Sequence, residues 1–263
     1  MPTPKTEATR TAVVTGGSAG IGAATVRHLA AAGYRVVAGA RRLDVLRSVT
    51  DPVGASALPL DVTDPDSVAS FAEQAGLENL HLLVNNAGAA LGLDSIEDAV
   101  EERWRGMFEL NVMGVLRVTR AFLPALEASK DGHVINVGSI AGFETYPGGG
   151  GYTASKHGLR AMTRTLRLEL LGRPVRVTEV APGLAETEFS LVRFDGDAGR
   201  AKSVYDGMQP LTGDDVAECI VWAAQRPPHV NIDEIVVRPT AQATSTAVHR
   251  EPSHSEPAHR EED

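Results

Sequence analysis

The chain of 263 residues contains one cysteine, few aromatic residues (5%) and no long hydrophobic run. A single cysteine, Cys219, forms neither an internal disulfide nor a cysteine-based metal site, which fits a reducing compartment. No apolar run approaches the roughly 18 residues that a membrane helix needs, so we predict no membrane span. The opening residues, MPTPKTEATR, lack the apolar stretch of a secretory signal. We therefore expect a cytoplasmic protein that packing alone stabilises.

Basic residues are in deficit. The sequence has 25 lysines and arginines against 34 acidic residues, a net charge of −9. Nucleic acids and anionic membranes attract basic surfaces, so this balance argues against both as partners. A small-molecule partner is the expectation that remains.

Short apolar segments alternate with longer segments of helical period. The predicted strands are 11–15, 34–39, 57–60, 80–85, 133–138, 175–181 and a weak last strand near 234–237. The predicted helices are 21–32, 65–75, 112–127, 152–171 and 214–224. Strands that are apolar on both faces and separated by helices indicate a parallel sheet covered on both sides.

These elements predict a doubly wound α/β fold of the Rossmann type, with about seven parallel strands. At about 150 residues per domain, the length allows one large domain or two small ones. Because no linker interrupts the alternation, we predict a single domain over residues 11–240. Residues 1–10 are expected to be a flexible N-terminus. Residues 241–263 lack apolar periodicity and are expected to be a tail, disordered after about residue 250.

A glycine-rich loop follows the first strand directly. Its sequence, Thr15-Gly16-Gly17-Ser18-Ala19-Gly20-Ile21-Gly22, leads into a helix. In a doubly wound fold this turn brings backbone N–H groups and a helix N-terminus to a pyrophosphate. We therefore expect Gly16, Ser18, Gly20, Ile21 and Gly22 to bind a dinucleotide, a tight turn being the alternative.

The end of the second strand predicts which dinucleotide binds. NAD sites usually place an acidic residue there, whereas this sequence has Gly39-Ala40-Arg41-Arg42. Arg41 and Arg42 favour the extra 2′-phosphate of NADP, unless they simply begin a solvated helix. The ends of the third and fourth strands supply further candidates for cofactor contact: Asp61, Val62, Asn86, Ala87 and Gly88. For Asp61 a turn or cap role is the alternative.

A tyrosine and a lysine stand four residues apart at the start of a predicted helix. In Tyr152-Thr153-Ala154-Ser155-Lys156 this spacing places both side chains on one face. A nearby ammonium favours the phenolate, so Lys156 is expected to lower the pKa of Tyr152. Ser139 follows another strand and is placed to polarise the same carbonyl. Asn111, at the predicted head of a helix, is placed to hold a water in line with Lys156. Taken singly, Ser139 and Asn111 also suit caps.

In this order, TGGSAGIG, NNAG, NVMG, Ser139 and YTASK resemble the short-chain dehydrogenase/reductase family over nearly the whole chain. The resemblance implies hydride transfer at nicotinamide, with Tyr152 as acid–base and Ser139 orienting the substrate. It also implies that Lys156 binds the nicotinamide ribose and that Asn111 completes a tetrad. Pro182, Gly183 and Thr187 resemble the segment that contacts the nicotinamide carboxamide. A homotetramer is implied as well.

The stretch from Pro182 to about Gln242 is similar to the NADP-dependent 3-hydroxy acid dehydrogenases. Their substrates carry a carboxylate, and Arg193 is a candidate to anchor it. Alternatively Arg193 pairs with Glu188 or Asp195. Phe143, Tyr146 and Pro147 are expected to wall the substrate pocket, and Ser139 to contact the substrate.

Two features depart from the resemblance. The glycine run 148–151 predicts a flexible loop ahead of Tyr152. His249, His254 and His259 are regularly spaced in the acidic tail, but a solvated tail is the simpler interpretation, and we predict no metal site. Two further functions stay open: reduction of a larger ketone, and NADPH sensing without catalysis.

Overall fold

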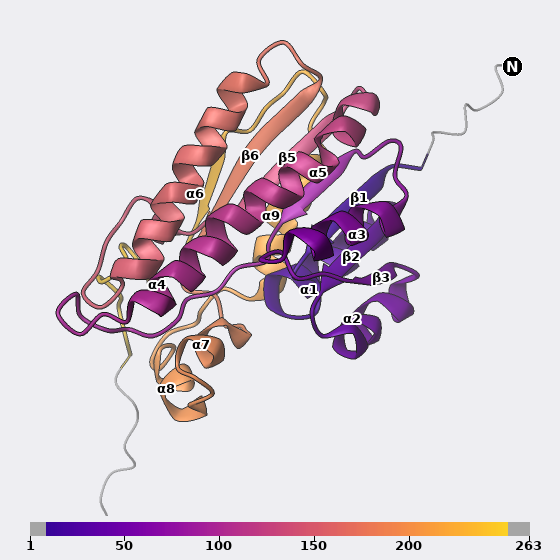
Figure 1. Cartoon of the computed structure of the whole chain (residues 1–263). Helices are drawn as coiled ribbons and strands as arrows, with labels where there is room; N and C mark the ends of the chain where they lie inside the picture. Colours follow the sequence, from indigo (N-terminus) through magenta and orange to yellow (C-terminus); the bar gives the residue numbers. More distant parts are fainter. Residues whose placement is uncertain (1–8, 252–263) are drawn as a thin grey trace, which may run out of the picture.

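The computed structural model describes residues 9–251 and contains one seven-stranded parallel sheet (Figure 1). The strands are β1 (Thr11–Thr15), β2 (Arg35–Ala40), β3 (Ser56–Pro59), β4 (Leu82–Asn85), β5 (Gly132–Val137), β6 (Val175–Pro182) and β7 (Glu234–Val237). Their order in space is β3-β2-β1-β4-β5-β6-β7. The predicted doubly wound fold is confirmed.

Helices cover both faces of this sheet. They are α1 (Gly20–Ala31), α2 (Leu43–Thr50), α3 (Pro65–Ala75), α4 (Glu101–Phe108), α5 (Gly114–Ala128), α6 (Gly150–Glu169), α7 (Glu188–Arg193), α8 (Ala198–Ser203) and α9 (Gly213–Ala224). Figure 1 shows α7 and α8 together as a small lobe at one end of the sheet.

Alternate residues of each strand feed two separate apolar cores. In β1, Val14 packs in the core that α1, α2 and α9 cover, whereas Val13 packs in the core under α3, α5 and α6. Both valines are fully buried. Strands buried on both faces explain why the sequence shows continuous apolar runs instead of alternation.

A row of polar side chains crosses the sheet from near the carboxyl ends of β4 and β5, through the middle of β6, to the first residue of β7. Asn85, Asn136, Glu179 and Glu234 are register partners on β4 to β7. Asn85 donates to Asn136 at 2.9 Å, and Asn136 donates to Thr163 of α6 at 2.8 Å. This row ties α6 to the sheet close to the edge where ligands bind in such folds.

The structure changes the expected helix around Asn111. Residues 101–128 form one continuous helical rod in which a π-helical turn, Glu109–Met113, separates α4 from α5. Asn111 therefore lies inside a widened turn and not at the head of a helix. Such turns occur frequently at functional sites, and this one has no pattern that sequence periodicity detects.

Helices α2, α4, α7 and α8 have no counterpart in the predicted elements. Each is at most eight residues long, too short to repeat an apolar stripe. Residues 241–251, expected as a tail, lie against the domain: the backbone N–H of Glu251 donates to the Gly207 carbonyl at 2.7 Å. His254 and His259 lie outside the described residues.

Candidate active site

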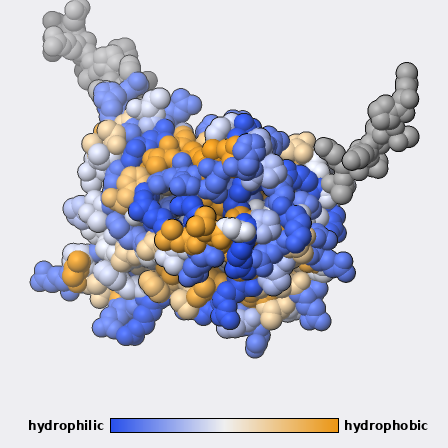
Figure 2. All heavy atoms as spheres, turned by 90° about the horizontal axis from the view of Figure 1, so that it is seen from above, coloured by the Kyte–Doolittle hydropathy of each residue, from blue (hydrophilic) through white to orange (hydrophobic). Residues whose placement is uncertain are grey.

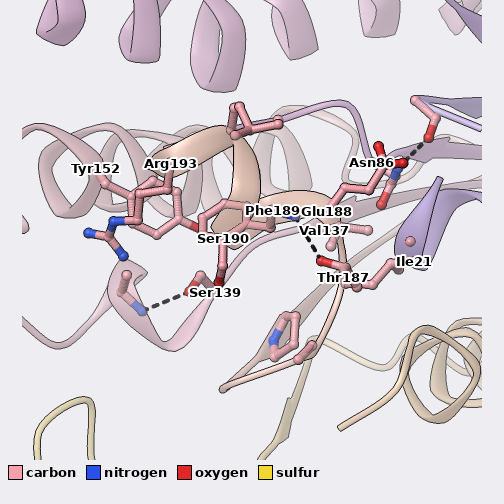
Figure 3. Close-up of a pocket in the computed structure, with 18 of the residues that line it drawn as sticks. Ile21, Asn86, Val137, Ser139, Tyr152, Thr187, Glu188, Phe189, Ser190 and Arg193 are labelled. Carbon is pink, nitrogen blue, oxygen red and sulfur yellow. Dashed lines mark hydrogen bonds between the residues drawn. The ribbon is translucent and has the colours of Figure 1, made fainter. Parts of the chain in front are cut away.

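One cavity of about 770 Å³ extends along the carboxyl ends of the strands (Figure 3). It runs from the glycine-rich loop after β1, past the ends of β4 and β5, to α7. Successive strands are added on one side of β1 up to β3 and on its other side from β4 onward, and open α/β sheets bind ligands where the strand order reverses in this way. The cavity is therefore the candidate active site.

The glycine-rich loop is shaped for close approach of a ligand to backbone. Gly16 and Gly20 have φ angles of +67° and +53°, which favour glycine. A Cβ on Gly16 would come within 2.9 Å of the Ala87 Cα, and one on Gly22 within 2.2 Å of the Gly16 carbonyl oxygen. Gly16, Ser18, Gly20 and Ile21 line the cavity, whereas Gly22 packs behind the loop. These glycines let the loop lie close to the Asn86-Ala87 turn, so that the cradle facing the cavity is built of backbone, which suits a pyrophosphate.

The two arginines after β2 lie at the same end of the cavity. Arg42 is half-exposed, and its Nη2 lies 2.6 Å from a carboxylate oxygen of Glu188 on α7 and 3.5 Å from the Ser18 hydroxyl. Arg41 lies near Asp61. Two guanidinium groups at the edge of the glycine loop suit the 2′-phosphate of NADP. The Glu188 carboxylate would compete with that phosphate for Arg42, because it already pairs with the guanidinium.

The turns after β3 and β4 are held by their own hydrogen bonds. Asp61 accepts from the backbone and hydroxyl of Thr63 at 2.9 and 2.7 Å, so the turn role is present. Burial would raise the pKa of Asp61, but these bonds and Arg41 outweigh it and leave the pKa below its usual value. Asn86 donates from its side chain to the carbonyl oxygens of Thr15 and Gly16. Five predicted cofactor contacts in these turns line the cavity: Asp61, Val62, Asn86, Ala87 and Gly88.

Tyr152 and Ser139 meet in the middle of the cavity (Figure 3). Ser139 begins the turn after β5 and caps it by accepting from the Ala141 N–H at 3.1 Å. Burial raises the pKa of the Tyr152 phenol far above its usual value, while the Ser139 hydrogen bond and the Arg193 charge oppose this effect. The sequence predicts that Lys156 lowers the pKa of Tyr152, but in the structure Ser139 and Arg193 are the groups that lower it.

Lys156 is buried on the same face of α6, with its Nζ 5.9 Å from the centre of the Tyr152 ring. The ammonium donates to the Val137 carbonyl at 2.9 Å. Burial lowers the pKa of Lys156 to about 8, and the Glu179 carboxylate opposes the change. Lys156 is therefore mostly protonated at neutral pH.

Asn111 is buried beside this group and not in the cavity wall. Its side chain donates to the Ala89 carbonyl and the Ser155 hydroxyl, and it accepts from the Ala89 N–H. A Cβ on Gly88 would lie 2.9 Å from the Asn111 Oδ1 and 3.6 Å from the Lys156 Nζ. Gly88 thus stands between the two polar groups, and only a residue without a side chain leaves them this close.

Arg193, at the end of α7, is the cation beside Tyr152. Its guanidinium carbon lies 5.8 Å from the centre of the Tyr152 ring, and it donates to the Tyr146 hydroxyl at 2.9 Å and to the Gly92 carbonyl at 3.2 Å. Within residues 9–251 no carboxylate lies within salt-bridge distance of Arg193. The acids considered for it pair elsewhere: Glu188 with Arg42, and Asp195 with Arg103.

Two expectations about the pocket walls are wrong. Phe143 does not line the cavity, because its ring lies under the guanidinium groups of Arg160 and Arg238, 4.6 and 5.7 Å from its centre. The glycine run is closely packed instead of loose, since a Cβ on Gly151 would lie 2.4 Å from a methyl carbon of Met107. Tyr146 and Pro147 do line the cavity.

Several cavity residues were not identified from the sequence. Phe189 stacks edge-on against Tyr152 at 5.4 Å between ring centres. The Tyr205 hydroxyl contacts Ser190 at 2.7 Å. The segment after β7 contributes Gln242, Ser245 and Thr246. The aromatic character of Phe189 and Tyr205 is visible in the sequence and suits a pocket wall. Nothing in the sequence distinguishes Gln242, Ser245 and Thr246 from a solvated tail.

Pro182, Gly183 and Thr187 line the cavity where β6 leads into α7. Among residues 9–251 no group of three or more histidine, cysteine or acidic side chains is arranged to hold a metal ion. No helix within those residues has the length and apolar character to cross a membrane.

The glycine cradle, the strand order and the Tyr152–Lys156 pair define a dinucleotide-binding oxidoreductase site. A family model described as short chain dehydrogenase matches residues 10–196. The chain belongs to the short-chain dehydrogenase family.

Curated relatives match over most of their length. An uncharacterized oxidoreductase of Mycobacterium tuberculosis is 56% identical, with 90% of this chain and 94% of the relative covered. A sulfoacetaldehyde reductase of Chromohalobacter salexigens is 41% identical, with 88% and 94% covered. An NADP-dependent 3-hydroxy acid dehydrogenase of Escherichia coli is 38% identical, with 91% and 99% covered. The family is therefore shared along almost the whole chain.

A solved structure also matches. The closed form of a serine dehydrogenase complexed with NADP⁺ superposes with a TM-score of 0.86 at 38% identity and covers 92% of this chain and 100% of that chain. The fold and the family thus agree with each other.

Proposed function

We propose that the chain is an NADP-dependent oxidoreductase that interconverts a small 3-hydroxy acid and the corresponding 3-oxo acid, which is a semialdehyde where the hydroxyl is primary. Candidate substrates are serine, allo-threonine and 3-hydroxypropionate. Relatives named for 3-hydroxy acids and a serine dehydrogenase bound to NADP⁺ support this class.

The observation that carries the proposal is the position of Arg193. A guanidinium that faces the catalytic phenol and has no carboxylate partner among residues 9–251 suits an acidic substrate. The sulfoacetaldehyde reductase relative fits the same chemistry, because a sulfonate is also an anion of bidentate geometry. We therefore expect a small anionic substrate, with a carboxylate as the first candidate.

The proposed reaction divides between the residues of the site. When bound, NADP supplies the hydride acceptor for oxidation, and its reduced form the donor for the reverse reaction. In oxidation Tyr152 takes the hydroxyl proton, and in reduction it returns that proton to the carbonyl oxygen. Ser139 donates a hydrogen bond to the same oxygen. Burial, which raises the pKa of Tyr152, keeps it protonated in the site without cofactor, and the protonated phenol is the form from which reduction starts.

Cofactor binding is assigned to residues that line the rest of the cavity. Gly16, Ser18, Gly20 and Ile21 would hold the pyrophosphate, and Arg41 and Arg42 the 2′-phosphate. Lys156 would bind the nicotinamide ribose, while Pro182, Gly183 and Thr187 would contact the carboxamide. Asn111 is assigned the water that links Lys156 to solvent.

NADP reduction with serine and 3-hydroxypropionate tests the proposal directly. We expect turnover with at least one of them, and a loss of roughly 10²- to 10⁴-fold in Tyr152→Phe while NADP binding is retained. Turnover of bulky neutral ketones alone would favour the reductase alternative. Tight NADPH binding without turnover of any alcohol or carbonyl would favour the sensing alternative.

We also propose that the enzyme works in the cytoplasm as a homotetramer. The single cysteine fits a reducing compartment. Two exposed apolar side chains, Phe108 on α4 and Leu168 on α6, support burial against further copies. Figure 2 shows that the face seen there is mostly hydrophilic, with apolar residues in a few small groups. Sedimentation equilibrium tests the assembly.

A further inference from the structure

Glu179 on β6 is a buried carboxylate without an assigned role. Only 2% of its surface is exposed, and its Oε1 has no hydrogen-bond donor among residues 9–251. Burial of a carboxylate that lacks hydrogen bonds is unfavourable unless opposite charge compensates it. The groups around Glu179 must therefore supply that compensation.

The free oxygen lies under the loop that carries Ser139. A Cβ on Gly138 would come within 2.3 Å of the Glu179 Oε1, and one on Gly142 within 3.6 Å. The same Cβ on Gly142 would lie 3.1 Å from the Lys156 carbonyl oxygen. Glu179 thus lies against both ends of the catalytic serine turn, and the Gly142 end of that turn packs against the Lys156 carbonyl.

Four charged groups face Glu179: Lys156, Arg160 and Arg164 from α6, and Glu234 from β7. Arg160 lies 3.9 Å away but gives its hydrogen bonds to Glu234, one of them 2.7 Å long. Arg164 is largely exposed, and it too contacts Glu234, at 3.9 Å. Glu234 therefore already compensates the two arginines in part, and Lys156 is a further buried cation whose charge acts on Glu179 beside that of Arg160.

The sheet register brings Lys156 to the same place. Its ammonium donates to the Val137 carbonyl, and the next residue, Gly138, lies directly against the Glu179 oxygen. Burial lowers the pKa of Lys156, and Glu179 is the charge that opposes this fall. In turn, burial raises the pKa of Glu179, while Arg160 and Lys156 oppose that rise.

We propose that Glu179 is a positioning residue of the active site, whose carboxylate keeps the Lys156 ammonium protonated beneath the Ser139 turn. The proposal rests on the role of Lys156 in the proposed function. It requires no contact between Glu179 and substrate or cofactor. Its effect passes through the charge of Lys156 alone.

The test measures the protonation of Lys156 directly. Protein without added cofactor is labelled with acetic anhydride across a range of pH, and acylation of Lys156, which lines the cavity, is followed by peptide mass spectrometry. In Glu179→Gln the midpoint of labelling should move down by about one pH unit. The matched control is Glu234→Gln, which removes a carboxylate from the same row one strand further from Lys156 and should move the midpoint less than Glu179→Gln does.

An unchanged midpoint in Glu179→Gln, or an equal shift in Glu234→Gln, would overturn the proposal. Should Glu179→Gln fail to fold, Glu179→Asp withdraws the carboxylate by one methylene and should give a smaller shift in the same direction. Failure to turn over any 3-hydroxy acid would leave this labelling result intact, so the two proposals fail separately. With an active substrate, the alkaline limb of kcat should move with the labelling midpoint.

Discussion

The two halves of the cavity are built differently. Around β1 and β4 the wall consists of backbone, glycine and short side chains, held by bonds such as Asn86 to the Thr15 carbonyl. Around α7 the wall consists of long side chains: Tyr146, Phe189, Arg193 and Tyr205. Backbone fits the one shape of a dinucleotide, whereas side chains can be exchanged to suit different substrates. Each half nevertheless presents arginine to its ligand.

The largest expected effect on cofactor binding lies in the backbone-lined half. In Gly22→Ala the new methyl group would lie 2.2 Å from the Gly16 carbonyl oxygen, so the loop must move. Overpacking of this kind costs about 1–3 kcal/mol, which corresponds to a loss of NADP affinity of up to about 100-fold. Calorimetric titration measures it. Gly106→Ala on α4, whose Cβ would make only an ordinary 3.4 Å contact, is the control.

The second expected effect concerns the choice of dinucleotide. Arg42→Ala should weaken NADP binding by about 10- to 100-fold and leave NAD binding nearly unchanged, because only NADP carries the 2′-phosphate. Fluorescence titration with both cofactors measures the ratio. Arg47→Ala, an exposed arginine of α2 that pairs with Asp44, should change neither affinity. Equal losses for the two dinucleotides would remove Arg42 from the phosphate site.

The third effect lies in the half lined by side chains. Arg193→Met keeps much of the side-chain volume but removes the charge, and should raise KM for a 3-hydroxy acid about tenfold. Steady-state kinetics measure it, with Arg200→Met on the neighbouring α8 as the control, since Arg200 does not line the cavity. An unchanged KM in Arg193→Met would disprove the anchoring role.

The smallest effect is on stability and comes from Lys156, between the halves. Its pKa is about 8 in the folded protein against an ordinary value of 10.5, so between these values the unfolded chain binds more protons. The contribution of Lys156 to the free energy of unfolding should therefore rise from about pH 7.5 to 9, by on the order of 1 kcal/mol. Urea unfolding of wild type and Lys156→Met isolates this contribution. A difference between the two proteins that does not vary with pH would contradict it.

The sequence predicted the backbone-lined half well, because its requirements are local. The glycines that approach each other, and the arginines where an acid would bind NAD, are close neighbours in the chain. The fold followed for the same reason, since strands buried on both faces produce short, continuous apolar runs. Even there, Gly22 proved to support the loop from behind the cavity wall.

The half lined by side chains was harder to predict, because distant segments build it. The sequence predicts Phe143 as a pocket residue, but its ring is covered by Arg160 of α6 and by Arg238 of the segment after β7. Gln242 lies against the turn after β6, where its side-chain oxygen accepts from the Leu184 N–H at 2.8 Å. Neither contact has a period or motif. The π-helical turn at Asn111 and the buried carboxylate of Glu179 escaped prediction for the same reason.

Because arginine lies in both halves of the cavity, we infer that the protein recognises two anions. These are the 2′-phosphate of the cofactor and the acid group of a small substrate. The most direct test compares NADP reduction by 3-hydroxypropionate and by its uncharged methyl ester, which present the same hydroxyl to Tyr152. We expect a kcat/KM at least about tenfold higher for the acid, since a charged hydrogen bond contributes about 1.5–3 kcal/mol. An ester oxidised as efficiently as the acid would contradict it.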